Sequence, residues 1–403
     1  MKKRIIFVTN SMVLGGIEKS LLDLIYLLPK DQFEITLLLD QKKGGFLPYV
    51  PENVRICQLK YSEEDRMELI EGRVPRMKYA LKKFHFKYIA EILWKRLKWI
   101  IKGRKYSFDY PAFDSILHRT PQIFDGQFDI AVAYFGDMMF SLGVVLNYIN
   151  AKTKVCWTHS EHPFAQMNLA LHKDYYSRFD YRFACSQATA ARINNAIGEE
   201  IVKAVPHTFA VERMKKMAIH EENVFPRTEN FPVVLTVARL DKQKGIDIAI
   251  EAHEKLLQKG IKHYWFVVGE GNGNGDEEKY HQMVTDKKLS ESFIFLGGKD
   301  NPYPYFRECD IYVQPSRYEG YCITVAEARV FRKPIVATDF DGAREQLKDN
   351  ETGFIVPCTV DAISEGLEKL LKSSTLRNKF SDNLSKENID TQSEVLKLWT
   401  DLK

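Results

Sequence analysis

Two glutamates eight positions apart, Glu319 and Glu327, form the most distinctive group of chemistry-bearing side chains in this sequence. They follow an apolar run, an expected strand, that ends at Gln314. Proline, serine and glycine residues then interrupt the run, and we expect a helix to start near Tyr321 or Cys322. A helix N-terminus at the carboxyl end of a parallel strand attracts phosphate, and open α/β sheets bind ligands there. Two carboxylates beside such a site would accept hydrogen bonds from sugar hydroxyls, although spacing alone fits a surface glutamate and an ordinary helical glutamate as well.

Two cations and a pair of glycines could hold a phosphate in a similar way. Arg239 and Lys244 share one loop after another expected strand, and two cations there suit a pyrophosphate leaving group. Gly15 and Gly16 lie between the first expected strand and the first expected helix, where backbone N–H groups could approach a phosphate closely. They do not complete the G-x-G-x-x-G fingerprint of a dinucleotide site, which disfavours a dehydrogenase. Taken alone, these residues also fit a solvated basic loop and a tight turn.

His159, Gly269 and two aspartates also follow expected strands. His159 could bond a sugar hydroxyl or be a structural histidine, and Gly269 opens a Gly-Glu-Gly cluster. Asp339 and Asp341 have the D-x-D spacing of metal-dependent transferases, but they precede Gly342, and we interpret them as a loop and predict no metal site. The six cysteines are scattered and no pair has C-x-x-C spacing, so neither a zinc site nor a redox pair is indicated.

Short apolar runs that alternate with helix-period segments must position these residues. Continuous Val/Ile/Leu runs in β-α-β order are typical of a parallel sheet covered on both faces, and this order begins again after residue 230. The sequence therefore predicts an α/β protein with doubly wound domains at 1–207 and 208–382, and a helix within 383–403 that could pack back on the first domain. Expected strands lie at 4–9, 33–39, 129–135, 153–158, 232–238, 264–268, 293–296, 311–314 and 334–338, and expected helices include 18–28 and 246–258.

In this order, the motifs resemble those of glycosyltransferase family 4, whose members are retaining enzymes with the GT-B fold. The resemblance is most specific from about Val234 to Val356 and is weaker in the first half of the chain. It implies two Rossmann-like domains that face each other across a cleft, with the active site in that cleft. The residues that carry it are Gly15-Gly16, His159, Arg239, Lys244-Gly245, Gly269-Glu270-Gly271, Pro315-Ser316, Glu319 to Glu327, 334–338, Gly342, Glu345 and Thr352-Gly353.

The resemblance also implies roles for these residues. Arg239 and Lys244 would hold the diphosphate of a nucleotide-sugar, Glu327 would bond the ribose hydroxyls, and Glu319 would lie near the hydroxyls of the donor sugar. Backbone N–H groups after Gly320 would support both ends of the donor. The predicted catalytic residues are Arg239, Lys244, Glu319 and His159, and the predicted donor-binding residues are Gly15, Gly16, Gly269, Gly320, Tyr321, Cys322 and Glu327.

The sequence departs from the family pattern at a few positions. Ala238 stands where the family often has glycine, and Arg332 and Asp341 replace frequent glycines. The stretch Val205-Pro-His-Thr-Phe209 replaces the usual V-P-N-G-V-D-like stretch. None of these changes removes a proposed charge partner, although Asp341 could trim the pocket.

One basic segment stands apart from the otherwise balanced charge of the chain. The net charge is only +4, which does not indicate a nucleic-acid partner. Between Arg73 and Lys105, however, twelve basic residues and a single acidic residue alternate with aromatic and aliphatic side chains. This pattern is typical of a basic amphipathic helix on an anionic membrane, although a core-packed helix has the same period. The predicted membrane-contact residues are Trp94, Lys95, Arg96, Lys98, Trp99 and Lys102.

These observations lead to one expectation about function. We expect a retaining glycosyltransferase that uses a nucleotide-sugar, with a UDP-sugar favoured, and needs neither a further cofactor nor a metal. Its acceptor would be a glycan or a lipid-linked glycan in bacterial surface-polysaccharide synthesis, and the enzyme would be cytoplasmic and peripheral on the inner face of the cytoplasmic membrane. A catalytically silent nucleotide-sugar-binding subunit and a GT-B sugar-nucleotide epimerase remain alternatives.

Overall fold

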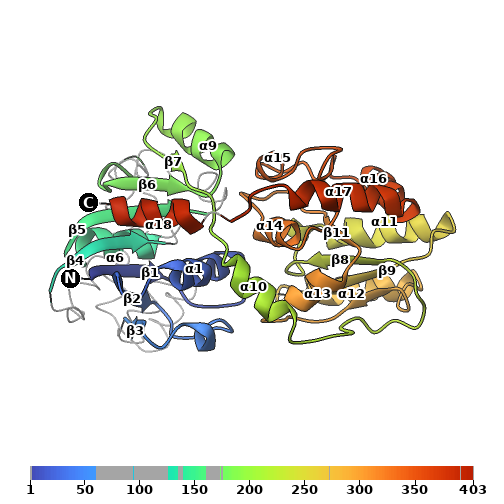
Figure 1. Ribbon diagram of the computed structural model, residues 1–403, viewed down its shortest axis with the longest axis horizontal. Helices are drawn as coiled ribbons and strands as arrows, with labels where there is room; N and C mark the ends of the chain where they lie inside the picture. The colour runs from blue at the N-terminus through green and yellow to red at the C-terminus, as the bar shows by residue number, and fades with distance from the viewer. Residues whose placement is uncertain are drawn as a thin grey trace.

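The computed structural model describes residues 2–59, 94, 126–134, 139–159, 173, 176–271, 273–390 and 392–402. These residues fold into two α/β domains that lie side by side (Figure 1). Each domain is built on one sheet, and every strand pairing recorded in either sheet is parallel. The predicted fold class, two doubly wound parallel-sheet domains, is confirmed.

The sheet of the N-terminal domain has the strand order β3-β2-β1-β4-β5-β6-β7. Its central strands β1, β2 and β4 contain mostly apolar runs, as expected for strands that are covered on both faces. The bounds of its strands are β1 (Lys3–Thr9), β2 (Phe33–Leu39), β3 (Arg55–Gln58), β4 (Phe128–Ala133), β5 (Ala151–Thr158), β6 (Tyr181–Ala184) and β7 (Lys203–Ala204).

Helices cover both faces of this sheet. On one face α1 (Gly16–Leu27) packs together with α18 (Gln392–Asp401), which returns from the far end of the described chain (Figure 1). On the other face lie α6 (Met139–Asn147) and α9 (Gln187–Ile197). The short helix η1 (Leu47–Tyr49) follows β2.

The sheet of the C-terminal domain has the strand order β10-β9-β8-β11-β12-β13. Like the first sheet, it consists of apolar strands between two layers of helices. Its strands are β8 (Val233–Val237), β9 (Tyr264–Val268), β10 (Phe293–Phe295), β11 (Ile311–Gln314), β12 (Ile335–Thr338) and β13 (Gly353–Val356).

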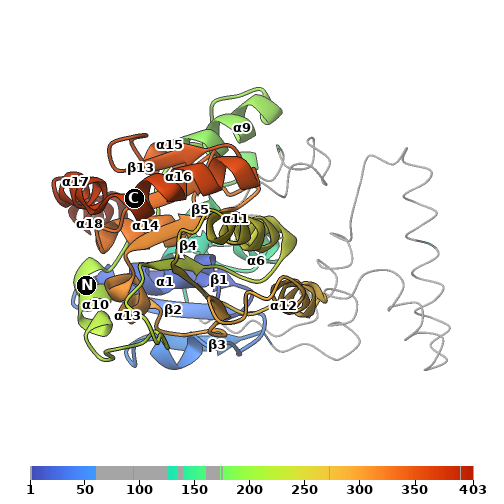
Figure 2. The ribbon, with the colours of Figure 1, turned by 90° about the vertical axis from the view of Figure 1, so that its right-hand side faces the viewer.

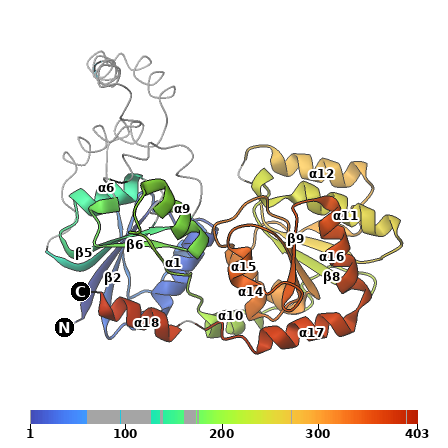
Figure 3. The same ribbon diagram turned by 90° about the horizontal axis from the view of Figure 1, so that it is seen from above.

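Two sets of helices cover the second sheet, one set on each face. One face carries α10 (Val211–Ala218), α13 (Tyr303–Glu308) and α14 (Ile323–Val330). The other carries α11 (Ile246–Gln258), α12 (Asp276–Asp286), α16 (Val360–Lys372) and α17 (Ser374–Ser385). Figure 3 shows α10 and the segment between α17 and α18 where the chain passes between the domains. The short elements η2 (Lys242–Lys244) and α15 (Ala343–Gln346) lie in loops that follow β8 and β12.

Strand order reverses once in each sheet, between β1 and β4 and between β8 and β11. The loops after neighbouring strands diverge at such a point, and open α/β sheets bind ligands there. The predicted glycine pair follows β1, and the predicted cations and glutamates follow β8 and β11. The fold therefore brings the predicted site residues to both switch points.

The structure corrects one predicted element and leaves others untested. The predicted helix within 383–403 is the end of α17 and, after a break, α18. The predicted domain boundaries stay a prediction. Of the six predicted membrane-contact residues, Lys95, Arg96, Lys98, Trp99 and Lys102 lie outside the described residues, and Trp94 is 57% exposed. No helix within the described ranges is both long enough and apolar enough to span a bilayer.

Candidate active site

A cavity of about 750 Å³ lies between the two domains. The N-terminal domain contributes the start of α1 and the residue after β5, and the C-terminal domain contributes the loops after β8, β9 and β11. The structure brings every predicted catalytic and donor-binding residue to this one cavity: Gly15, Gly16, His159, Arg239, Lys244, Gly269, Glu319, Gly320, Tyr321, Cys322 and Glu327.

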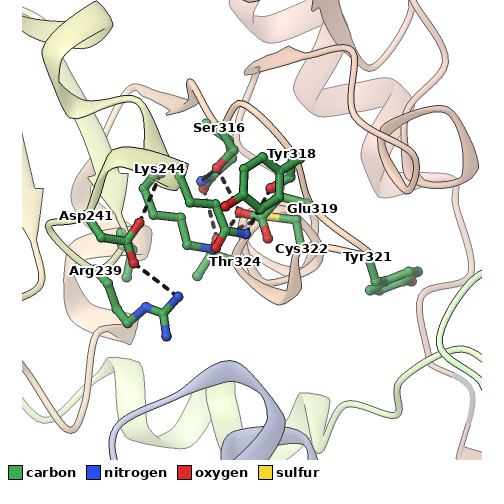
Figure 4. A network of polar contacts seen from close by, with 12 residues as sticks. Arg239, Asp241, Lys244, Ser316, Tyr318, Glu319, Tyr321, Cys322 and Thr324 are labelled. Carbon is green, nitrogen blue, oxygen red and sulfur yellow. Dashed lines mark hydrogen bonds and ion pairs between the residues drawn. The ribbon is translucent and has the colours of Figure 1, made fainter. Parts of the chain in front are cut away.

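Lys244 and Glu319 form a buried ion pair on the C-terminal wall of the cavity (Figure 4). The Lys244 Nζ lies 2.6 Å from the Glu319 Oε1, and both side chains are largely buried. Glu319 Oε1 also accepts a hydrogen bond of 2.7 Å from the Ser316 hydroxyl. Burial lowers the pKa of Lys244, but the negative charge of Glu319 more than offsets this effect, so the pKa lies above its ordinary value. Lys244 therefore stays charged although it is buried.

The loop after β8 is shaped so that Lys244 meets the end of β11. Asp241 accepts a hydrogen bond of 3.2 Å from the backbone N–H of Lys244 and ion-pairs with Arg239 at 3.1 Å. Gly245 has a φ of +67°, and a Cβ there would lie 2.0 Å from the carbonyl oxygen of Pro315. Only glycine allows this close approach. Arg239, at the cavity side of the loop, is half exposed.

The N-terminus of α14 opens into the same cavity. Cys322 precedes the helix with a φ of 68°, which is uncommon for a residue other than glycine. The carbonyl oxygens of Tyr321 and Cys322 accept hydrogen bonds from the Gln346 side chain, which secures this turn. The predicted helix start near Tyr321 or Cys322 is thus one or two residues early.

Glu327, on α14, lines the cavity close to the N-terminal domain. The Tyr303 hydroxyl lies 3.3 Å from its Oε1, and the positive charge of Lys19 on α1 acts on the carboxylate. Burial raises the pKa of Glu327 to about 7, and Lys19 partly counteracts this rise. Lys19 also lines the cavity and lies 2.5 Å from Asp23. Nothing in the sequence pattern distinguishes Lys19 from other polar residues of that helix.

The glycine pair before α1 has two different neighbours. A Cβ on Gly16 would meet Ile323 of the other domain at 3.4 Å, and a Cβ on Gly15 would lie 2.4 Å from the Glu18 carboxylate. Burial raises the pKa of Glu18 to about 7, while its own backbone N–H and Arg239 act in the opposite direction. The start of α1 is therefore occupied by a carboxylate that is readily protonated near neutral pH.

His159 and His207 lie stacked on the N-terminal wall, with ring centroids 4.9 Å apart and an interplanar angle of 17°. Burial lowers the pKa of His207 to about 3, and burial together with His207 lowers the pKa of His159 well below its ordinary value. Both rings are therefore neutral. Sequence reasoning missed His207 as a site residue, and its only signal was the departure from the family pattern at 205–209.

The D-x-D aspartates are each paired with an arginine. Asp339 lies 2.6 Å from Arg344, and Asp341 pairs with Arg192 of the N-terminal domain. Nearby, the Glu345 carboxylate accepts the backbone N–H groups of residues 187 and 188, at the start of α9, at 2.9 and 3.0 Å. Among the described residues, no three His, Cys, Asp or Glu side chains are grouped so that they could hold a metal ion.

Residues 219–387 match the family model described as "Glycosyl transferases group 1". This segment, less than half of the chain, belongs to the glycosyl transferases of group 1. For this segment the family predicted from the sequence is confirmed, and the group 1 segment contains the cations, both glutamates and Gly269.

Two curated relatives match parts of the chain. An alpha-D-kanosaminyltransferase from Streptomyces kanamyceticus is 28% identical over 38% of this chain and 39% of its own length. A poly(ribitol-phosphate) alpha-N-acetylglucosaminyltransferase from Staphylococcus aureus is 24% identical over 60% of this chain and 52% of its own. The chain thus spans about half, or less, of the length of these relatives.

Among solved structures, Anabaena Alr3699/HepE in complex with UDP-glucose is similar over both domains. The TM-score is 0.69 at 18% sequence identity, and the alignment covers 99% of this chain and 98% of the other. The likeness confirms that the group 1 segment is one half of a GT-B fold.

Proposed function

We propose that this protein is a retaining glycosyltransferase that moves a sugar from a nucleotide-sugar to a hydroxyl group of an acceptor. One observation carries the proposal: two cations and two glutamates from the group 1 segment meet the glycine pair of the other domain in one interdomain cavity. Cations suit a diphosphate, and buried carboxylates suit the hydroxyls of sugar and ribose.

The reaction needs stabilisation of the leaving group above all. As the bond between the sugar C1 and the diphosphate oxygen breaks, negative charge grows on the diphosphate. Arg239, Lys244, the glycine pair and the start of α14 all border the cavity in which that charge would develop, although the Gly15 N–H group itself already donates to the Val13 carbonyl oxygen. Each preorganised donor of this kind contributes about 3 kcal/mol in related oxyanion sites.

The acceptor hydroxyl would attack C1 from the same face of the sugar ring as the one from which the leaving group departs. Its oxygen forms the new bond to C1, and its proton passes to an oxygen of the departing diphosphate, so atoms and charge balance without a protein nucleophile. Both curated relatives are named for alpha transfer, which supports retention when the donor sugar is alpha-linked. Closure of the two domains over the donor would exclude water and limit hydrolysis.

In this proposal the two carboxylates bind different parts of the donor nucleotide-sugar. Glu327, deep between α13 and α1, bonds the ribose hydroxyls. Glu319, held by Ser316 and Lys244, lies near the hydroxyls of the sugar. UDP is the favoured nucleotide, and the complex of Anabaena HepE with UDP-glucose supports this choice.

The acceptor is proposed to be a glycan or a lipid-linked glycan of bacterial surface-polysaccharide assembly. The basic amphipathic segment between Arg73 and Lys105 supports this choice, because an acceptor carried on a lipid is met at a membrane surface. The protein would then work in the cytoplasm, peripherally bound to the inner face of the membrane.

A thermal-shift screen tests the central claim. A ligand that binds only the native state raises the melting temperature. At a ligand concentration about one hundred times its Kd, it raises the free energy of unfolding by about 2.7 kcal/mol. We expect UDP and at least one UDP-sugar to raise the melting temperature, and GDP and ADP to do so less. If no nucleotide or nucleotide-sugar shifts it, the proposed function is wrong.

A further inference from the structure

Two stacked imidazoles on the N-terminal wall of the cavity leave ring nitrogens open to a ligand. His159 is only 6% exposed and has the backbone of Tyr134 as a polar neighbour, yet among the described residues neither Nδ1 nor Nε2 has a partner with good hydrogen-bond geometry. His207 is 3% exposed, and within the described ranges the structure records a partner only for its Nδ1. Buried polar groups are normally satisfied, so poorly satisfied ring nitrogens beside a cavity indicate a ligand with hydrogen-bonding groups.

The charge of the two rings selects the kind of ligand. Both imidazoles are neutral, because burial lowers the pKa of each well below its ordinary value. A neutral imidazole has one N–H donor and one acceptor nitrogen, and both can hydrogen-bond a hydroxyl group. It has no positive charge with which to attract a phosphate. The diphosphate instead has Arg239 and Lys244 on the opposite domain. The histidine wall therefore suits the uncharged sugar.

A short chain of hydroxyls fixes the proton on His207. The Tyr134 hydroxyl is fully buried and lies 2.6 Å from the Ser20 Oγ, which lies 2.6 Å from the His207 Nδ1. Within the described structure Ser20 is the recorded partner of the Tyr134 hydroxyl, and a buried phenol needs an acceptor for its proton; with Tyr134 donating to Ser20, Ser20 donates in turn to Nδ1. The ring proton of His207 then sits on Nε2, where it can be donated to a ligand oxygen.

We propose that His207 is a specificity-determining residue that donates from Nε2 to a hydroxyl of the donor sugar, with Ser20 and Tyr134 as its positioning residues. Together, His207 and His159 select donors whose sugar carries two free neighbouring hydroxyls at this wall, because nearly parallel rings 4.9 Å apart can each bond one of them. This inference rests on the proposed function and adds a residue and a substrate class to it.

Calorimetry on the whole protein tests the inference with UDP, UDP-glucose, UDP-galactose and UDP-N-acetylglucosamine as probes. We expect His207→Ala to weaken the best-bound UDP-sugar about 10-fold or more, which is about 1.4 kcal/mol, and to change the affinity for UDP less than about twofold. His220→Ala, on an exposed histidine, is the matched control and should change neither affinity.

A substrate series separates a hydrogen bond from a structural effect. Monodeoxy analogues of the best donor are measured with the wild type and with His207→Ala. The analogue that lacks the hydroxyl bound by His207 should bind the wild type about 10-fold less tightly and lose nothing more in the variant. Ser20→Ala and Tyr134→Phe, which keep the imidazole, should show a smaller loss confined to the UDP-sugar.

The outcomes are distinct. If the wild type binds neither UDP nor any UDP-sugar, the proposed function fails. If the wild type binds them and His207→Ala weakens UDP and UDP-sugar equally, or neither, the inference is overturned while the proposed function stands. If His207→Ala does not fold, Ser20→Ala and Tyr134→Phe decide the matter by the same comparison of UDP with UDP-sugar.

Discussion

The Lys244 ammonium group and the Glu319 carboxylate lie 2.6 Å apart in a largely buried ion pair. The cation proposed for the diphosphate and the carboxylate proposed for the sugar are therefore one electrostatic unit. A change at either residue leaves the other charge buried without its partner, which has consequences for stability as well as for catalysis.

The two cations are expected to differ in what they do for stability. Lys244→Ala and Arg239→Ala should each lower turnover at least about 100-fold, through loss of a donor to the leaving group. Lys244→Ala should also cost about 3 kcal/mol of stability because it breaks a buried pair. Arg239→Ala should cost little stability because the Arg239 side chain is half exposed. Steady-state kinetics and melting temperatures measure both effects. Lys242→Ala, in the same loop, is the control, and near wild-type turnover in both cation variants would contradict the assignment.

The two glutamates should separate nucleotide binding from sugar binding. Glu327→Gln should weaken UDP itself because the ribose hydroxyls lose a charged acceptor. Glu319→Gln should spare UDP and weaken the UDP-sugar, since the amide keeps an oxygen for Ser316. Titration calorimetry with both ligands measures the difference, and equal effects on UDP and UDP-sugar would rule out this division of roles.

A buried histidine pair in the C-terminal domain should make stability depend on pH. His253 Nδ1 lies 2.9 Å from His263 Nε2, and burial lowers the pKa of His263 to about 4. An unfolded histidine has a pKa of about 6.5, so the unfolded state binds more protons at acid pH. The stability contributed by the neutral pair is complete above about pH 6.5 and is lost as the pH falls toward about 4.

The melting temperature should therefore fall between pH 7 and pH 5, and His263→Gln should reduce this fall. His220→Gln, on an exposed side chain, should leave it unchanged. A fall of the same size in the wild type and in His263→Gln would show that other groups cause it.

Turnover is expected to continue in the presence of a chelator. The Asp339 and Asp341 carboxylates are already paired with Arg344 and Arg192, and Lys244 and Arg239 are placed to meet the charge of the leaving group. Initial rates with and without EDTA should agree within about twofold. Loss of activity that Mg²⁺ or Mn²⁺ restores would move the two aspartates into the site.

Anionic vesicles should bind the protein through the basic segment. Each basic residue near an anionic leaflet contributes about 1 kcal/mol, and salt screens the attraction. Co-sedimentation should require anionic lipid, decrease with added salt and drop when Lys95, Arg96, Lys98 and Lys102 are changed to glutamate. If the wild type ignores anionic vesicles at low salt, the segment is structural and the acceptor is soluble.

The sequence predicts most of the long apolar strands well and misses several short or polar ones. The predicted strands at 33–39, 264–268 and 311–314 coincide with β2, β9 and β11, because strands buried on both faces are continuous apolar runs. β3 at the edge of the first sheet reads Arg-Ile-Cys-Gln and is half-exposed, so it lacks that signal. β7 has only two residues, which is too short for any pattern.

The candidate site divides along the same line. The cations, glutamates and glycines follow strands in the motif order, so their places at the carboxyl ends of the two sheets could be expected. Lys19 and His207 depend on the approach of the two domains and on the path of the 205–209 stretch, and no local pattern encodes either. The same holds for Glu345, whose contact with the start of α9 joins residues about 158 positions apart in the chain.

Because α18 packs on the N-terminal domain, it sets the order in which the two domains can complete their folding. Trp399 is fully buried in the core of the N-terminal domain, 5.5 Å from Phe7 and 6.2 Å from Trp157 between ring centroids (Figure 1 shows α18 from the side, and Figure 2 looks along it from behind the C-terminal domain). During synthesis, the first domain to leave the ribosome therefore lacks Val395, Trp399 and Leu402 of one core layer until the second domain has been made. Its exposed apolar face must wait for that closing segment, which ties the completion of the first domain to the translation of the second.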